Sequence, residues 1–256
     1  MDFLNGICAP EDIHYIGVGE FASSYIGEGY KIIYKEEEID EYSEALWLCL
    51  VADGESLADL ALLERVLDRC KADEVFVILA NSTSPERAKA LKQKCSCILT
   101  LGSDDAETGV VPLMELVGHM YTDARLLELD TAELRALFDP VRTVAHHSLW
   151  YEDIDPQAFE RDVRALELAE HAWPTMICIL LPLSEDDMQL NELIAPLFGL
   201  IPQGGHRLVL WNVYRSELAH YGGMRVDIVR AKPALGTMQV LRDANKQLRT
   251  EQENEE

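Results

Sequence analysis

Residues 46–59 of the chain read LWLCLVADGESLAD. The first six form an apolar run of strand length, and apolar residues recur at helical spacing from Leu57 onward. A strand that passes through a short turn into a helix often binds phosphate with glycine amides and the helix N-terminus. Here Asp53, Glu55 and Asp59 replace the glycines of such a turn. We therefore expect this turn to repel an anion.

The alternation of strands and helices continues through the first half of the chain. The strands that we expect are 13–18, 30–34, 46–51, 75–80 and 97–101. Helices are expected over 57–67, after the cap and proline of 84–86, and over 110–120. The acidic residues 36–41 are interpreted as a solvated loop. This order predicts an α/β domain with a Rossmann-like parallel sheet and crossover helices.

The second half has a different order of elements. The strands expected there are 141–149, 175–181, 208–214 and 224–229, with helices over 131–139, 156–171 and 190–198. Two consecutive strands joined through Gly222-Gly223 indicate a mixed or antiparallel sheet, so we predict an α+β domain. The predicted boundaries are 1–125 for the first domain, 126–235 for the second and 236–256 for a polar tail.

The composition of the chain restricts its partners. With 46 acidic and 22 basic residues among 256, the formal charge is −24, which disfavours nucleic acid and anionic membranes as partners. No segment has the length and apolarity of a signal peptide or a membrane span, so a cytoplasmic location is expected. The six cysteines form no C-x-x-C framework and are interpreted as reduced thiols, without a metal site.

Four segments of the chain together resemble one family. Ile16-Gly17-Val18-Gly19 is similar to a first glycine turn, and 53–59 stands where a G-G-G-T-G-T/S-G loop follows the strand 48–52. The strand 75–80 with its following helix is the third segment, and 126–135, LLELDTAELR, is the fourth. With the order of elements, they resemble the tubulin/FtsZ superfamily over nearly the whole chain. The resemblance implies a two-domain body with a long connecting helix, in a family that includes bacterial cell-division proteins.

The phosphate turns that the resemblance assigns are degenerate in this chain. They comprise Gly17, Gly19, Glu20, Asp53, Gly54 and Glu55. Glu20 stands where an oxyanion would approach, and an alternative for Gly17 and Gly19 is a turn that only reverses the strand. We therefore expect neither a bound cofactor nor GTPase activity.

The segment 126–135 resembles the family's synergy loop, which enters the nucleotide pocket of the next subunit. Asp130 and Glu133 match its acidic positions, Arg135 matches its arginine, and Glu128 replaces an asparagine. The resemblance implies that these residues form an interaction surface. Asp130 and Glu133 also have the spacing of a helix capping box, and both roles are compatible.

The pair His146-His147 invites a metal or catalytic interpretation. Neighbouring residues on a strand point to opposite faces, and no carboxylate or third histidine stands nearby at ligand spacing. A structural role is therefore expected.

Three functions agree with these observations. The first is a non-hydrolysing FtsZ-like protein that acts through protein–protein association, with an intact filament subunit or a second copy as partner, and that modulates or caps a filament. The second is a divergent GTPase with a rebuilt pocket. The third is a self-assembling scaffold that needs no nucleotide.

Overall fold

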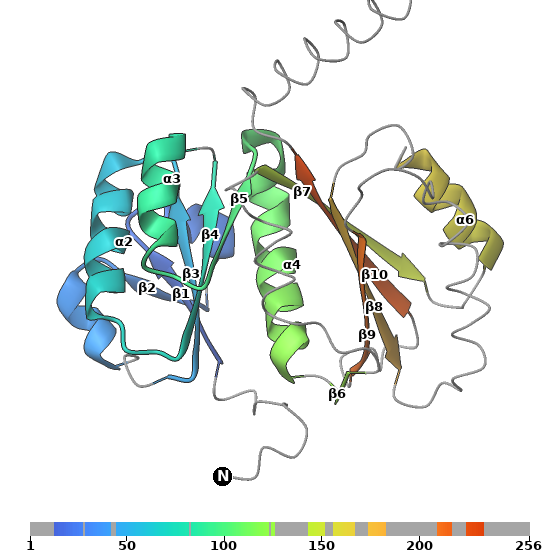
Figure 1. The fold of residues 1–256 in the computed structure, drawn as a ribbon, viewed down its shortest axis with the longest axis horizontal. Coiled ribbons are helices and arrows are strands. Elements are labelled where there is room, and N and C mark those ends of the chain that lie inside the picture. Colours follow the sequence, from blue (N-terminus) through green and yellow to red (C-terminus); the bar gives the residue numbers. More distant parts are fainter. Residues whose placement is uncertain are drawn as a thin grey trace, which may run out of the picture.

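A computed structural model describes residues 13–27, 29–41, 45–81, 83–122, 124–125, 143–151, 156–166, 174–182, 209–216 and 224–232 of the chain. Within these ranges the strands form a single ten-stranded sheet in the order β2-β1-β3-β4-β5-β7-β10-β8-β9-β6. Figure 1 shows the sheet running across the whole molecule, with helix α4 between its two halves. The chain has the α/β architecture that the sequence predicted.

The first half is a parallel sheet with crossover helices. Its elements are β1 (Ile13–Val18), α1 (Ala22–Ile26), β2 (Lys31–Ile33), β3 (Trp47–Asp53), α2 (Leu57–Arg69), β4 (Glu74–Ala80), α3 (Pro85–Lys92) and β5 (Cys97–Leu101). The predicted strands lie within two residues of these bounds. β1 pairs in parallel with both β2 and β3, and β4 with β3 and β5.

The acidic connection after β2 is a helix, so its interpretation as a loop was wrong. Residues Glu36–Glu41 form the 3-10 helix η2. Ile39 is fully buried there, and Glu36 and Asp40 form ion pairs with Arg65 and Arg69 of α2. One apolar anchor and two cations on a neighbouring helix therefore order a segment that looks uniformly solvated in the sequence.

The central strands are buried on both faces because helices cover both. Cys49 and Val51 of β3 pack into one hydrophobic cluster, together with residues of α4. Leu48 and Leu50 of the same strand pack into the other cluster, with residues of α2. Coverage on both sides explains why this strand is an almost continuous apolar run instead of an alternating one.

Helix α4 (Ser103–Thr122) joins the two halves and begins before the predicted 110–120. Val110, Leu113 and Met114 are buried in the cluster that also contains residues of β7, β8 and β10. The helix therefore packs against strands from both parts of the chain, as Figure 1 shows. No helix in the described ranges is both long and apolar enough to span a bilayer.

The second half is a mixed sheet, as predicted. Its elements are β6 (Ala124–Arg125), β7 (Thr143–Tyr151), α6 (Pro156–Ala165), β8 (Thr175–Pro182), β9 (Val209–Ser216) and β10 (Met224–Lys232). β10 is antiparallel to β7 and β8, whereas β8 and β9 are parallel. The consecutive strands β9 and β10 are not neighbours, because β8 lies between them.

The predicted end of one helix and the predicted division into two domains can also be compared with the structure. Helix α6 ends at Ala165, before the predicted end at 171, and Leu166 closes it with a bond from its amide to the carbonyl of Val163. The parallel pairing of β5 with β7 makes the two predicted domains share one sheet. The expected helices 131–139 and 190–198 and the polar tail lie outside the described residues.

Candidate functional site

The candidate site is the edge of the sheet where β1 and β3 end. These strands are parallel neighbours, with Gly17 opposite Val51, so their following turns meet at the same edge. The turn after β1 contains Gly19 and Glu20, and the turn after β3 contains Gly54 and Glu55. The fold thus brings together the two segments that the sequence identified as degenerate phosphate turns.

Asp53, the last residue of β3, is 7% exposed and accepts four hydrogen bonds. Its Oδ1 accepts the backbone amides of Glu55 at 2.7 Å and Ser56 at 3.1 Å. Its Oδ2 accepts the Tyr25 hydroxyl at 2.6 Å and the Asn81 side-chain amide at 3.2 Å. The carboxylate therefore occupies two backbone donors of its own turn.

Tyr25 of helix α1 and Asn81, which follows β4, complete this cluster. The Asn81 side-chain amide also donates to the Tyr25 hydroxyl at 2.8 Å. Burial, followed by the hydrogen bond to Asp53, raises the pKa of Tyr25 to about 12. The tyrosine is therefore a neutral donor at physiological pH and holds α1 against the end of β3.

Asp59 occupies the neighbouring turn. Ser56 caps helix α2 by accepting the amide of Asp59 at 3.2 Å, and the Asp59 Oδ2 accepts the backbone amide of Phe21 at 3.2 Å. The Asp59 side chain is 3% exposed and lies in the first turn of α2, where the helix dipole stabilises negative charge. A carboxylate of the chain itself thus binds an amide in the turn after β1.

The glycines of both turns allow this close packing. Gly19 has φ +94°, and a Cβ on it would lie 2.1 Å from Cγ of Asp59. A Cβ on Gly54 would lie 2.5 Å from the carbonyl oxygen of Asn81. Gly17, inside β1, packs against α1, since a Cβ there would lie 2.7 Å from Cδ1 of Ile26. The space that the missing side chains leave is therefore filled by other residues of the same chain.

The outcome for the predicted site residues is mixed. Gly19, Asp53 and Gly54 lie together at this edge, while the side chains of Glu20 and Glu55 are exposed on it. Glu20 was predicted at the oxyanion position, whereas the carboxylate that lies against Gly19 is that of Asp59. Glu128, Asp130, Glu133 and Arg135 lie outside the described residues, so their predicted role stays a prediction.

Two residues of the site were missed. Asn81 follows β4 with φ +68°, a left-handed conformation that asparagine tolerates better than most residues, so its position after a strand was a weak signal. Tyr25 carried no signal, because only the packing of α1 brings its hydroxyl to Asp53, 28 residues away.

His146 contacts a carboxylate that the sequence did not place near it. His146 Nε2 lies 2.8 Å from Oδ1 of Asp227 on the adjacent strand β10, although no carboxylate is near it in the sequence. Both side chains are almost fully buried. Among the described residues no group of three or more possible ligands could hold a metal ion.

Asp227 also contacts a buried arginine. Its Oδ2 lies 2.8 Å from Nε of Arg225, without the alignment of a hydrogen bond, so the contact is an ion pair. The Arg225 guanidinium also reaches α4, where it donates hydrogen bonds to the Glu115 carboxylate at 2.9 Å and to the Pro112 carbonyl at 3.1 Å. This network connects the second half of the sheet to α4, and nothing in it requires a ligand.

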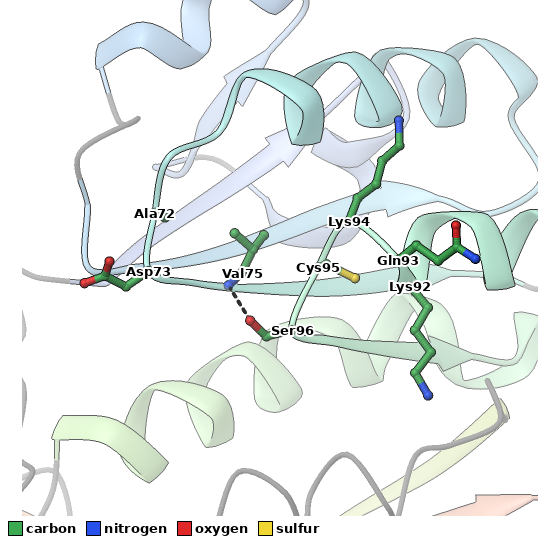
Figure 2. Close-up of a pocket in the computed structure, with 8 residues that line it drawn as sticks. All are labelled: Ala72, Asp73, Val75, Lys92, Gln93, Lys94, Cys95 and Ser96. Carbon is green, nitrogen blue, oxygen red and sulfur yellow. Dashed lines mark hydrogen bonds between the residues drawn. The ribbon is translucent and has the colours of Figure 1, made fainter.

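A separate hollow of about 450 Å³ lies at the amino ends of β4 and β5 (Figure 2). Figure 2 shows Ser96 beneath Val75, whose amide donates to the Ser96 hydroxyl at 3.1 Å. Lys94 forms an ion pair with Asp68 at 2.7 Å. Because these polar groups already bind other parts of the chain, the hollow is a weaker candidate than the opposite edge of the sheet.

The fold can now be compared with known proteins. No protein-family model matches the sequence, and no curated protein matches it. Among solved structures, a mutant of FtsZ from M. jannaschii is similar with a TM-score of 0.52 and 12% identity, over 77% of this chain and 68% of that chain. An empty FtsZ dimer from M. jannaschii is similar with a TM-score of 0.53 and 12% identity, over 77% of this chain and 66% of that chain.

Proposed function

Because the chain has an FtsZ-like fold, we propose that it acts through association with other protein chains and that it neither binds nor hydrolyses GTP. The observation that supports this is the occupation of both turns by the chain's own carboxylates. Asp53 binds the amides of Glu55 and Ser56, and Asp59 binds the amide of Phe21. A triphosphate would have to displace two buried anions from the donors that it needs.

The energetics support the same conclusion. Micromolar affinity corresponds to only about 8 kcal/mol. A hydrogen bond to a charged group contributes roughly 1.5–3 kcal/mol, so withdrawing three backbone amides from a phosphate removes most of that amount. Leaving Asp53 and Asp59 in place adds repulsion, because both are anions beside the position of the phosphate.

The proposed association is asymmetric. We infer that Glu128, Asp130, Glu133 and Arg135 form a loop that docks on an intact filament subunit, as the sequence resemblance implies. The edge that carries the candidate site would not accept the next FtsZ-type subunit. A chain that binds a filament through one face alone would cap it or modulate its length.

A nucleotide titration tests the first part of this proposal. The full chain is titrated with fluorescent GTP and magnesium, with an intact FtsZ as the positive control. We expect no saturable binding below millimolar nucleotide and no phosphate release. Saturable micromolar binding would instead support a divergent GTPase with a rebuilt pocket and contradict the proposal.

Filament assays test the second part. Adding the chain to FtsZ filaments should change their length or turnover, and the variant Asp130→Asn/Glu133→Gln should lose that effect while remaining folded. Unchanged filaments with the unmodified chain would refute capping. Sedimentation of the purified chain alone distinguishes a self-assembling scaffold, which would pellet without any nucleotide or filament.

A further inference from the structure

Three large apolar side chains are exposed at the edge of the sheet that carries the candidate site. Phe21 is 53% exposed, Tyr34 is 55% exposed and Leu57 is 69% exposed. We call these three residues the apolar patch. Each follows a different strand: Tyr34 comes after β2, Phe21 after β1 and Leu57 after β3. β2, β1 and β3 are consecutive neighbours in the sheet, so the three connections lie side by side.

Hydrogen bonds hold the backbone of the apolar patch in place. The amide of Phe21 donates to Asp59 in the first turn of α2, two residues after Leu57. The amide of Gly19 donates to the carbonyl of Ile33, next to Tyr34, and the amide of Tyr34 donates to Glu38. Adjacent strands are about 4.8 Å apart, so the three positions span roughly 10 Å. This is the width of one helix.

The surroundings of the apolar patch are strongly acidic. The charged residues nearest the apolar patch along these connections are Glu20, Lys35, Glu37, Glu38 and Glu55. Glu20, Glu37 and Glu55 are exposed, and Lys35 is the single cation among these five residues. Exposed carboxylates therefore lie beside the apolar patch, while Glu36 and Asp40 further along form ion pairs with Arg65 and Arg69 of α2.

We propose that the apolar patch binds a basic amphipathic segment of a partner protein. The three apolar side chains would be covered by apolar residues of the segment at helical spacing, and the acidic surroundings would attract its lysines and arginines. A second copy of this chain is disfavoured because each copy carries a formal charge of −24. The proposal rests on the proposed function only in that no nucleotide occupies this edge.

The charges predict the behaviour of the complex. Complementary charges accelerate association, and salt screens them, so binding should weaken as the ionic strength rises. Binding to the acidic surface alone would be abolished by salt and would not depend on the apolar side chains. Dependence on both properties distinguishes the proposed docking site from a non-specific attraction between opposite charges.

The test uses a fluorescent 18-residue helical peptide of leucine and lysine, with leucines on one face, and a scrambled peptide of the same composition. The unmodified chain should bind the amphipathic peptide more tightly than the scrambled one. The variant Phe21→Ser/Leu57→Ser should weaken binding at least tenfold. Leu46→Ser is the matched control, because Leu46 is an exposed leucine beside the opposite end of β3, and it should leave binding unchanged.

Several outcomes would overturn the proposal. Equal binding of both peptides, or no weakening by Phe21→Ser/Leu57→Ser, would show that charge alone drives binding. Equal weakening by Leu46→Ser and Phe21→Ser/Leu57→Ser would show that the apolar patch is not the docking site. A change in oligomeric state of Phe21→Ser/Leu57→Ser in sedimentation would assign the apolar patch to self-association instead. Circular dichroism shows whether each variant is folded. The assay contains no nucleotide, so its result is separate from the GTP titration that tests the proposed function.

Discussion

The two halves of the molecule stabilise buried carboxylates in different ways. At the ends of β1 and β3, Asp53 and Asp59 bind backbone amides, a tyrosine hydroxyl and a side-chain amide, all of them neutral donors. In the second half, fully buried Asp227 contacts a histidine and an arginine from neighbouring positions of the sheet. The first arrangement is built mostly from short turns, whereas the second combines a contact within β10 with a contact between the paired strands β7 and β10.

The difference has consequences for ligand binding and for stability. The hydrogen-bond donors to Asp53 and Asp59 carry no formal charge, so we expect that edge of the molecule to disfavour anions. The Arg225–Asp227 pair is compensated internally, and removing Arg225 leaves the buried Asp227 without its arginine. The first region therefore bears on the proposed lack of nucleotide binding, and the second connects α4 to the mixed sheet.

The largest expected effect is that of Arg225→Met. It leaves Asp227 buried without its cation and removes the bonds to Glu115 and Pro112, so the free energy of unfolding should fall by about 3–5 kcal/mol. Urea unfolding followed by circular dichroism measures this loss. The control Arg164→Met, in an exposed pair with Glu160, should cost less than about 1 kcal/mol. Equal losses for both variants would contradict the importance of the buried pair.

A smaller effect is expected for Asp53→Ala. The variant removes the acceptor of four hydrogen bonds, but the turn amides of Glu55 and Ser56 then become available to water, so we expect a loss of about 1–3 kcal/mol. Asp53→Asn keeps one acceptor oxygen for the amides and should lose less. If Asp53→Ala destabilised the chain as much as Arg225→Met does, the two regions would not differ as described.

The smallest effect concerns Tyr25 and depends on pH. Its pKa is raised from 10.0 to about 12 in the folded chain, so the folded state retains the hydroxyl proton more strongly than the unfolded state. This stabilisation is fully present below pH 10 and is lost as the pH rises toward 12. Tyr25→Phe should cost about 1 kcal/mol at neutral pH.

Unfolding midpoints between pH 8 and 12 test this prediction. The difference between the unmodified chain and Tyr25→Phe should shrink above about pH 10. A difference for Tyr25→Phe that does not change with pH would mean that the hydroxyl is not held by Asp53.

The sequence predicted those helices and strands correctly whose formation depends on neighbouring residues in the chain. Strands β1, β3, β4 and β5 were predicted because apolar runs on both faces of a parallel sheet are visible in any single strand. The cap at Ser84 and the proline start of α3 were likewise predicted from neighbouring residues. The helix η2 was missed because its order comes from Arg65 and Arg69 of another helix.

By itself, the sequence determined an acidic α/β chain with carboxylates in place of a phosphate loop, because periodicity, charge and turn composition are properties of short segments. Only the tertiary structure decided that Asp59 lies against Gly19, that Tyr25 reaches Asp53 and that Asp227 meets His146. Such contacts depend on strand order, register and the packing of α1. These arise from long-range association, which no local pattern of residues encodes.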